Sequence, residues 1–256
     1  MLAQPEKPRD HTVIHPSELC KTDFCARASY YTITQGPKRD KAGFRLQNIY
    51  DEGHYIHAKW QNRLRDMGIL YGMWYCQSCK LAYTGIGSSC PDCGSLLIDY
   101  REVSVYDRDL MISGHTDGWV KDDQGNVLIE IKSIGIGTIR FEEPSLLYSH
   151  ATLDDAWANI RRPFSTHIRQ GQLYLEMLRR MKEKGIYDEV PEEIVFIYEK
   201  KSDQAVKEFT VRANPATVKP MLDKAYDIAR AVRITKVAPE CSNDPINGCK
   251  ACKVYE

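Results

Sequence analysis

Three charged side chains lie around a predicted hairpin in the segment SGHTDGWVKDDQGNVLIEIKS, residues 113–133. Asp117 precedes the turn-forming run 122–126, and Glu130 and Lys132 follow it. Side chains alternate along a strand, so Glu130 and Lys132 share one face. Antiparallel pairing across the turn would bring Asp117 close to Glu130. Because two neighbouring carboxylates repel each other, the pattern predicts a site for a hard divalent cation, Mg²⁺ or Mn²⁺.

Lys132 adds a positive charge to this predicted site. A divalent cation activates water for attack on a phosphodiester, and a nearby ammonium can orient that water or stabilise the negative charge that develops. The patterns GxxD and ExK are short, however. Taken alone, they fit equally well an ordinary surface hairpin that carries a Lys–Glu pair.

Two predicted helices carry further polar side chains that could join the site. His57 lies on the apolar stripe of a helix predicted over 43–68, where a histidine is either a ligand or, more often, a hydrogen-bonded core residue. Gln170 and Tyr174 are four residues apart in a helix predicted over 167–184, so both project from one face. They are candidates for contact with a substrate or with the hairpin lysine, or for ordinary helix packing.

Hydrophobic periodicity predicts the elements that must position these residues. A third helix is predicted over 215–233, with Asn214 as its N-cap. Between 134 and 164 the chain lacks regular periodicity, and Thr152 with Asp155 three residues later predicts one short helix. A loop of this length is a candidate flap over a substrate. The predicted strands cover, in chain order, 102–106, 110–113, 116–120, 127–133, 193–199 and 206–211.

Four of the nine cysteines form the most specific pattern in the chain. Two CxxC pairs separated by ten residues can place four thiolates around a tetrahedral ion, and the glycine of CPDCG lets backbone amides turn toward the sulfurs. A structural Zn²⁺ ribbon with a closed coordination sphere and no catalytic role is therefore predicted. Its ligands are Cys76, Cys79, Cys90 and Cys93.

The other five cysteines stand toward the two ends of the sequence: Cys20, Cys25, Cys241, Cys249 and Cys252. In a reducing compartment such thiols are better explained by a metal than by disulfides. An iron–sulfur cluster or a second Zn²⁺ would bind them. A site that joins residues 25 and 241 would close a long loop and thereby stabilise the fold. Alternatively, Cys20 and Cys25 are buried apolar residues of a helix.

Composition narrows the class of protein only partly. The chain has 256 residues, 43% of them hydrophobic, which suits one large domain or a domain with a small insertion. Basic and acidic residues both number 35, so net charge neither favours nor excludes nucleic acid. Residues 21–65 contain nine basic and four acidic residues, and 161–184 contain seven and two. The sequence shows no signal peptide or membrane span, so we expect a soluble, intracellular protein.

Taken together, four short motifs resemble a known arrangement. In chain order they are GHYIH (53–57), GHTD (114–117), EIK (130–132) and QGQLY (170–174). They are similar to the GxxxH, GxxD, ExK and QxxxY motifs of the RecB-type nucleases, which belong to the PD-(D/E)XK superfamily. The resemblance extends in particular to CRISPR-associated adaptation exonucleases and their phage-encoded relatives.

The resemblance implies a role for each motif. The implied metal ligands are His57, Asp117, Glu130 and the backbone carbonyl of Ile131. The implied helpers are Lys132, which assists the attacking water, and Gln170 and Tyr174, which support the active centre. The implied enzyme hydrolyses DNA as an exonuclease on single strands or free ends, in recombination, replication or repair, in the cytoplasm of a bacterium or phage-infected host.

The same resemblance implies a metal clip. In the resembled family, one cysteine near the N-terminus and three near the C-terminus hold a 4Fe-4S cluster, and the first follows a serine and precedes an arginine and tyrosines. The residues around Cys25 match this pattern, with Ser17 before it and Arg27, Tyr30 and Tyr31 after it. The implied ligands are therefore Cys25, Cys241, Cys249 and Cys252, with a second Zn²⁺ as the alternative metal.

The implied fold is α/β, a restriction-endonuclease-like mixed β-sheet of about five or six strands flanked by helices. A zinc ribbon is inserted, and a cysteine metal clip joins the N- and C-terminal regions. The expected regions are an N-terminal helical segment of the nuclease domain (1–73), the inserted ribbon (74–98), the nuclease core (99–235) and a C-terminal cysteine metal-binding tail (236–256).

Two classes of function remain open from the sequence. The first is the nuclease, with DNA as its partner, a replication or recombination protein as a further candidate partner, and no membrane. The second is a non-catalytic zinc-ribbon nucleic-acid-binding or adaptor protein. Such a protein has no need of the intact set Asp117, Glu130 and Lys132, and so the sequence favours the nuclease.

Overall fold

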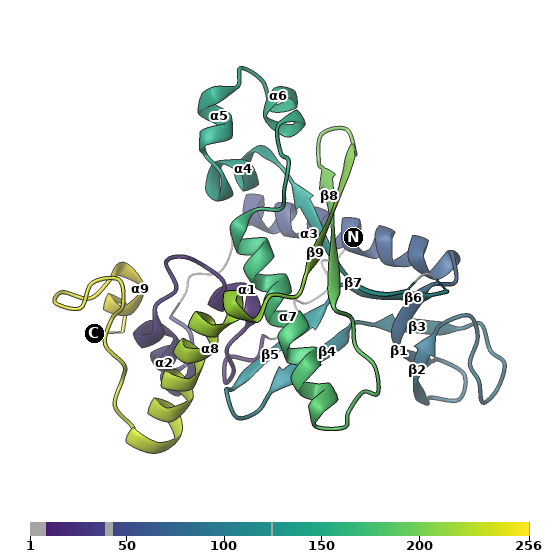
Figure 1. Ribbon diagram of the computed structural model, residues 1–256, viewed down its shortest axis with the longest axis horizontal. Helices are drawn as coiled ribbons and strands as arrows, with labels where there is room; N and C mark the ends of the chain where they lie inside the picture. The colour runs from purple at the N-terminus through teal and green to yellow at the C-terminus, as the bar shows by residue number, and fades with distance from the viewer. Residues whose placement is uncertain (1–8, 39–42, 124, 256) are drawn as a thin grey trace. The chain divides into compact units, whose positions relative to one another are not determined.

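Most strands of the computed structural model pair into one mixed sheet (Figure 1). Its strands are β1 (Leu70–Cys76), β2 (Ala82–Ile86), β3 (Ile98–Arg101), β6 (Gly118–Asp122), β7 (Gly125–Ile134), β8 (Glu193–Lys200) and β9 (Val206–Arg212). Across the described residues, which are 9–38, 43–123 and 125–255, these seven strands run in the order β2-β1-β6-β7-β8-β9, with β3 paired to β1. The β7–β8 pairing is parallel and the other pairings are antiparallel. The predicted α/β class with a mixed sheet is confirmed, and the sheet is mostly antiparallel.

The sheet has more strands than the sequence predicts, because the cysteine-rich segment contributes to it. β1 pairs with β2 and β3, and its first residues Leu70 and Tyr71 also pair with Val120 and Trp119 of β6. The predicted ribbon thus shares a strand with the main sheet. Strands β4 (Val103–Asp107) and β5 (Ile112–Thr116) form a separate two-stranded sheet.

Two long helices, α3 (Phe44–Asp66) and α7 (Ser165–Glu183), occupy the positions predicted for them. They lie on opposite sides of the sheet (Figure 1). Alternation along the strands explains this, because Ile131 of β7 packs with Ile56 of α3, while neighbouring positions face α7. On that second side, a Cβ at Gly171 would lie 2.7 Å from Phe196 Cζ and 2.8 Å from Ile194 Cδ1. The missing side chain lets α7 approach β8 closely.

The segment 134–164 is more regular than predicted. The sequence predicts one short helix, whereas the described chain contains three here: α4 (Ile136–Glu142), α5 (Ser145–Ser149) and α6 (Leu153–Ala158). The predicted cap of α6 is present, since Thr152 Oγ1 accepts a hydrogen bond from Asp155 N at 3.1 Å. Helices α4 and α5 follow Gly135 and Pro144. Neither has the Ser, Thr, Asp or Asn N-cap that would have marked it in the sequence.

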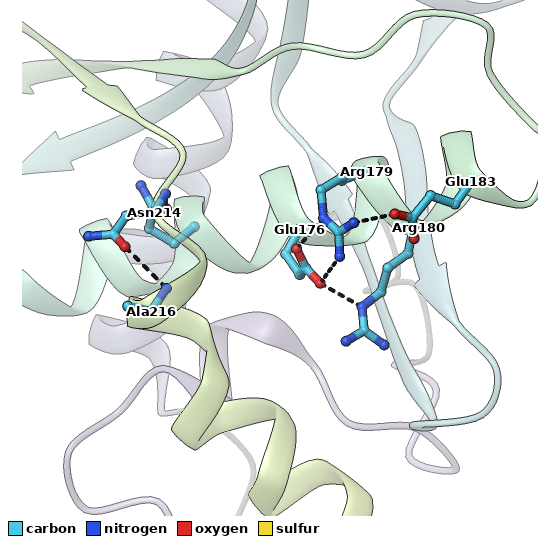
Figure 2. A network of polar contacts seen from close by, with 7 residues as sticks. Glu176, Arg179, Arg180, Glu183, Asn214 and Ala216 are labelled. Atoms are coloured by element: carbon cyan, nitrogen blue, oxygen red, sulfur yellow. Dashed lines mark hydrogen bonds and ion pairs between the residues drawn. The ribbon is translucent and has the colours of Figure 1, made fainter.

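Figure 2 shows side chains that fix the end of α7 and the start of α8 (Pro215–Arg230). Asn214 caps α8 as predicted, because its Oδ1 accepts a hydrogen bond from Ala216 N at 3.1 Å. On α7, Arg179 Nε donates to Glu176 Oε2 at 2.8 Å. The same network includes Arg180 and Glu183. Glu176 is buried, whereas Arg179 and Glu183 are largely exposed, so the outer pair contributes only about 0.5 kcal/mol.

Helix α8 does not end as a regular α-helix. The sequence predicts one helix to residue 233, whereas its last turn is a π-helix, η1 (Ala231–Thr235). The remaining helices of the described chain are α1 (Pro16–Leu19), α2 (Ala26–Gln35) and α9 (Lys250–Lys253). None of the helices in the described residues is long and apolar enough to span a membrane.

The chain divides into two compact units. The first comprises 1–40, 107–113 and 219–256, and the second comprises 41–106 and 114–218. The second unit contains the seven-stranded sheet with α3 and α7, and the first contains α1, α2, η1 and α9. Residues 1–8 and 39–42 of the predicted N-terminal helical region lie outside the described residues. The same holds for residue 124 of the predicted turn 122–126.

Candidate functional site

Asp117 lies where the ladder between β6 and β7 ends. The last residue pair on that side joins Gly118 to Ile129, and one further step places Asp117 opposite Glu130. Asp117 Oδ2 accepts a hydrogen bond from Ile131 N at 2.6 Å, so its carboxylate continues the ladder in place of a backbone carbonyl. The predicted approach of Asp117 to Glu130 therefore rests on strand register and on this side-chain contact.

A continuous chain of polar contacts leads from Glu130 to α7. Lys132 Nζ lies 2.7 Å from Glu130 Oε1 and donates to Gln170 Oε1 at 3.0 Å. Gln170 Nε2 in turn donates to Tyr174 OH at 2.9 Å. Glu130, Gln170 and Tyr174 are buried, whereas the Lys132 side chain keeps 19% exposure. The arrangement fixes the ammonium of Lys132 beside a carboxylate while leaving some of it accessible.

The side chain of His57, on α3, lies beside Asp117. Its Nδ1 lies 3.1 Å from Asp117 Oδ1, and its side chain is 29% exposed. One turn later on the same helix, Gln61 Nε2 donates to the backbone carbonyl of Asp117 at 2.8 Å. The helical spacing of His57 and Gln61 puts both side chains on one face, so α3 holds Asp117 through two contacts.

The structure adds one residue that sequence reasoning missed. Glu102, which lies between β3 and β4, has a carboxylate oxygen within 4.8 Å of the ligand atoms of His57 and Asp117. No spacing pattern connects Glu102 to the four motifs, because the contact depends on how β3, β4 and α3 pack. The only signal in the sequence is its position at the start of the first predicted strand, 102–106, which by itself points to no ligand.

Burial and mutual charge shift the ionisation of these groups in different directions. Burial would raise the pKa of Asp117, but His57, Lys132 and the Ile131 amide together lower it. Burial, followed by the charge of Asp117, raises the pKa of Glu130 to about 7 in spite of Lys132. Burial lowers the pKa of His57, and the charges of Asp117 and Glu130 outweigh this, so that the pKa is raised overall. Such divergent shifts within one cluster are typical of functional sites.

The donor set of this cluster suits a divalent cation. Glu130 Oε2 is buried and has no hydrogen-bond partner among the described residues, which is costly for a carboxylate unless something else satisfies it. The N–H of Ile131 faces Asp117, and the N–H and C=O of one strand residue point to the same side, so its carbonyl is directed there as well. Carboxylate, carbonyl and imidazole donors are those that Mg²⁺ and Mn²⁺ accept.

The raised pKa of Glu130 predicts that cation binding strengthens with pH. Below about 7 a proton occupies Glu130 and must leave before a cation binds, so affinity for Mn²⁺ should fall about tenfold per pH unit there. Without a cation, the stability contribution of this group is present below its ordinary pKa of 4.5 and lost as pH rises through about 7. The increase in melting temperature caused by Mn²⁺ should therefore be larger at pH 8 than at pH 6. An equal increase at both pH values would contradict this assignment.

A second cluster lies in the ribbon and consists of Cys76, Cys79, Cys90 and Cys93. Their sulfur atoms all lie within 4.8 Å of one another, with Cys76 Sγ 3.6 Å from Cys93 Sγ and Cys79 Sγ 3.6 Å from Cys90 Sγ. The backbone amide of Cys79 is the main cause that lowers the pKa of Cys76 to about 6. Four convergent sulfurs with amide donors are a suitable site for a tetrahedral metal ion.

A third cluster lies in the first unit and consists of Cys25, Cys241, Cys249 and Cys252. Cys25 Sγ lies 3.7 Å from Cys241 Sγ, although 216 residues separate them in the sequence. The group does not include Cys20, whose Sγ faces the carbonyl of Ser17 at 3.5 Å. Of the two N-terminal candidates, the structure therefore brings Cys25 to the three C-terminal cysteines.

The residues that surround Cys25 in the sequence contact the C-terminal segment. Arg27 Nε donates to the carbonyl of Pro239 at 3.1 Å, and Tyr30 OH donates to the carbonyl of Lys236 at 3.0 Å. Tyr31 stacks on Tyr255, with ring centroids 5.5 Å apart. These contacts bring the two ends of the chain together around the cysteines, as expected for a clip.

The thiols of the third cluster also differ in acidity. Burial raises the pKa of Cys25 to about 12. Burial acts in the same direction on Cys241, but amide donors that include those of Asp244 and Cys249 lower its pKa to about 6. The thiolate of Cys241 is a starting point for binding a soft metal, which displaces the protons of its other ligands.

Comparison with known proteins adds little to this site. No protein-family model matches the chain, and no curated protein matches it. The alkaline exonuclease LHK-Exo from Laribacter hongkongensis superposes with a TM-score of 0.41 at 12% identity, over 86% of this chain and 88% of that chain. The complex of LHK-Exo with dAMP superposes with a TM-score of 0.43 at 11% identity, with the same coverage of both chains. A protein designated SSO0001 superposes with a TM-score of 0.42 at 13% identity, over 87% of this chain and 77% of that chain. Values of this size do not assign a function to the chain.

Proposed function

We propose that this chain is a divalent-metal-dependent DNA nuclease of the PD-(D/E)XK superfamily, with a restriction-endonuclease-like core. The observation that carries the proposal is the unbroken set of contacts from His57 through Asp117 to Ile131, and from Glu130 through Lys132 to Gln170 and Tyr174. A surface hairpin with a Lys–Glu pair would not need partners from two helices on opposite sides of the sheet.

In this proposal the residues of the site have three roles, which are metal ligation, stabilisation of charge and positioning. Mg²⁺ or Mn²⁺, when bound, supplies Lewis acidity toward the scissile phosphate and lowers the pKa of the attacking water. Its proposed ligands are His57, Asp117, Glu130 and the carbonyl of Ile131. Lys132 stabilises the negative charge that develops during attack, and Gln170 and Tyr174 hold its ammonium in place. Gln170 and Tyr174 are therefore positioning residues.

The two cysteine clusters are proposed as structural metal sites. Cys76, Cys79, Cys90 and Cys93 would hold Zn²⁺, and Cys25, Cys241, Cys249 and Cys252 would hold a 4Fe-4S cluster or a second Zn²⁺. Neither group includes a side chain of the carboxylate site. A brown protein with iron and acid-labile sulfide would support the cluster, whereas two equivalents of zinc and no iron would overturn it.

The proposed substrate is DNA with a free end or in single-stranded form, cleaved as an exonuclease in recombination, replication or repair. The test compares circular and linear, single- and double-stranded DNA with Mg²⁺ or Mn²⁺, using the wild type and Glu130→Ala. We expect the wild type to degrade linear DNA and spare closed circular duplex, and the variant to degrade neither. Cleavage of closed circles would instead indicate an endonuclease.

The alternative function is a non-catalytic zinc-ribbon nucleic-acid-binding or adaptor protein. It would be favoured if the wild type bound DNA but cleaved none of these substrates under either cation. The intact pairing of Lys132 with Glu130 beside Asp117 argues against it, because binding alone gives no reason to bury a carboxylate that lacks a full set of partners.

A further inference from the structure

A carboxylate outside the four sequence motifs lies at the proposed metal centre. Glu102 joins His57 and Asp117 in a group whose ligand atoms all lie within 4.8 Å of one another. Glu102 is only partly buried, and Asp117 is buried. Because like charges this close repel each other, the arrangement needs a compensating positive charge.

The position of Glu102 is fixed by a side chain from α3. Gln61 Nε2 donates to Glu102 Oε1 at 3.1 Å and to the backbone carbonyl of Asp117 at 2.8 Å. One amide group therefore ties the Glu102 carboxylate to the backbone of the residue that it would otherwise repel. Gln61 follows His57 by one helical turn, so both act from the same face of α3.

The two oxygens of Asp117 point to different partners. Oδ2 accepts the amide of Ile131 at 2.6 Å, and Oδ1 lies 3.1 Å from His57 Nδ1. Glu102 offers a carboxylate oxygen within 4.8 Å of the ligand atoms of both His57 and Asp117. An imidazole nitrogen and two carboxylate oxygens at this separation form a donor set for a divalent cation such as Mn²⁺.

Charge supplies an independent reason to place a cation beside Asp117. With His57 neutral, as a metal ligand must be, the ionised carboxylates of Glu102, Asp117 and Glu130 exceed the ammonium of Lys132 by two negative charges, which matches one divalent cation. In addition, Glu130 Oε2, on a side chain that is only 2% exposed, has no hydrogen-bond partner within the described residues of the chain. A buried carboxylate oxygen that lacks a hydrogen-bond donor is expected to interact with an ion.

We propose that Glu102 is a direct ligand of the divalent cation, together with His57 and Asp117, and that Gln61 is the positioning residue that holds it there. This inference rests on the proposed function in one respect, because it takes the bound cation to be the catalytic one. It adds a carboxylate to the ligands that the sequence motifs contain, and it assigns a role to Gln61, which no motif includes.

The test is a titration of the purified full chain with Mn²⁺, followed by the electron paramagnetic resonance signal of the free ion. Glu102→Gln keeps an amide oxygen that can accept the hydrogen bond of Gln61 but removes the negative charge. We expect it to weaken Mn²⁺ binding by about tenfold or more. Gln61→Ala should weaken binding less, because Glu102 keeps its charge but loses its support.

Matched controls separate ligation from folding. Glu208→Gln removes an exposed carboxylate of β9 in the same unit and should leave Mn²⁺ binding unchanged. Glu102→Asp keeps the charge on a shorter side chain and should bind Mn²⁺ more tightly than Glu102→Gln, which tests the inference even if the glutamine variant is unstable. Wild-type affinity in both Glu102 variants would overturn the inference.

The readout also separates this inference from the proposed function. If the wild type cleaves DNA and Glu102→Gln binds Mn²⁺ normally, the inference fails and the function stands. If Glu102→Gln loses Mn²⁺ and the metal-loaded wild type does not cleave DNA, the function fails and Glu102 remains a ligand. A wild type that binds no Mn²⁺ overturns both.

Discussion

Replacing Glu130 with glutamine is expected to reduce metal-dependent DNA cleavage by about 10²- to 10³-fold. The substitution keeps the volume of a side chain that is 2% exposed, so the sheet should stay folded. It removes the charge that draws a cation to this position and that holds Lys132 at 2.7 Å. Initial rates on a linear DNA substrate at saturating Mg²⁺ or Mn²⁺, with melting temperatures of both proteins, provide the measurement.

Graded effects are expected along the contacts that lead away from Glu130. Lys132→Ala should lower the rate by a similar factor, because it removes the ammonium beside the reacting phosphate. Gln170→Ala should have a smaller effect, since Gln170 acts only by holding Lys132. Lys121→Ala is the matched control, because Lys121 lies on β6 of the same sheet and pairs with Glu189 of the loop between α7 and β8. Full activity in Asp117→Ala, Glu130→Ala and Lys132→Ala alike would rule out this centre.

Replacing Cys241 with serine is expected to produce the largest loss of stability. Cys241 is fully buried and lies 3.7 Å from Cys25 across 216 residues of sequence. A metal that links them closes that long loop, and the entropy lost by the unfolded chain suggests a stabilisation of about 5 kcal/mol, with disulfides as the reference. Serine is a poor ligand for iron or zinc, so the variant should lose both the metal and this stabilisation.

Cys20→Ser provides a matched control for that experiment. Cys20 is also buried, at 3% exposure, and belongs to the same unit, but it lies outside the cysteine group. It should keep the metal content of the wild type and lose less stability than Cys241→Ser. Iron and zinc per chain, together with denaturant unfolding, measure both effects. The clip would be contradicted if Cys241→Ser retained the full metal content, or if Cys20→Ser lost as much metal as Cys241→Ser.

The hairpin that carries Asp117, Glu130 and Lys132 could be predicted because its signals are local. Alternating side chains and a turn-forming run specify two paired strands, and pairing determines which residues face each other. The helical spacing of Gln170 and Tyr174 is sufficient in the same way to place both on one face. Spacing alone left open whether that face meets Lys132, a substrate or the helix packing, and the structure shows Gln170 in contact with Lys132.

Other features depend on packing between distant segments and have no local signal. Glu102 approaches His57 only because β3, β4 and α3 come together, and no sequence spacing reports this. Strand β1 joins the ribbon to the main sheet through Leu70 and Tyr71, which a pattern of cysteines does not reveal. Helices α4 and α5 lack side-chain N-caps, so their sequence is typical of a loop.

A crystal structure with bound Mn²⁺, with the ion located by its anomalous scattering, tests the proposed centre most directly. We expect a peak within about 2.6 Å of carboxylate oxygens from both Asp117 and Glu130, with His57 and Glu102 on the other sides of the ion. At a Mn²⁺ concentration that saturates binding in solution, a structure without a peak among these side chains, or with the ion bound elsewhere, would contradict the centre.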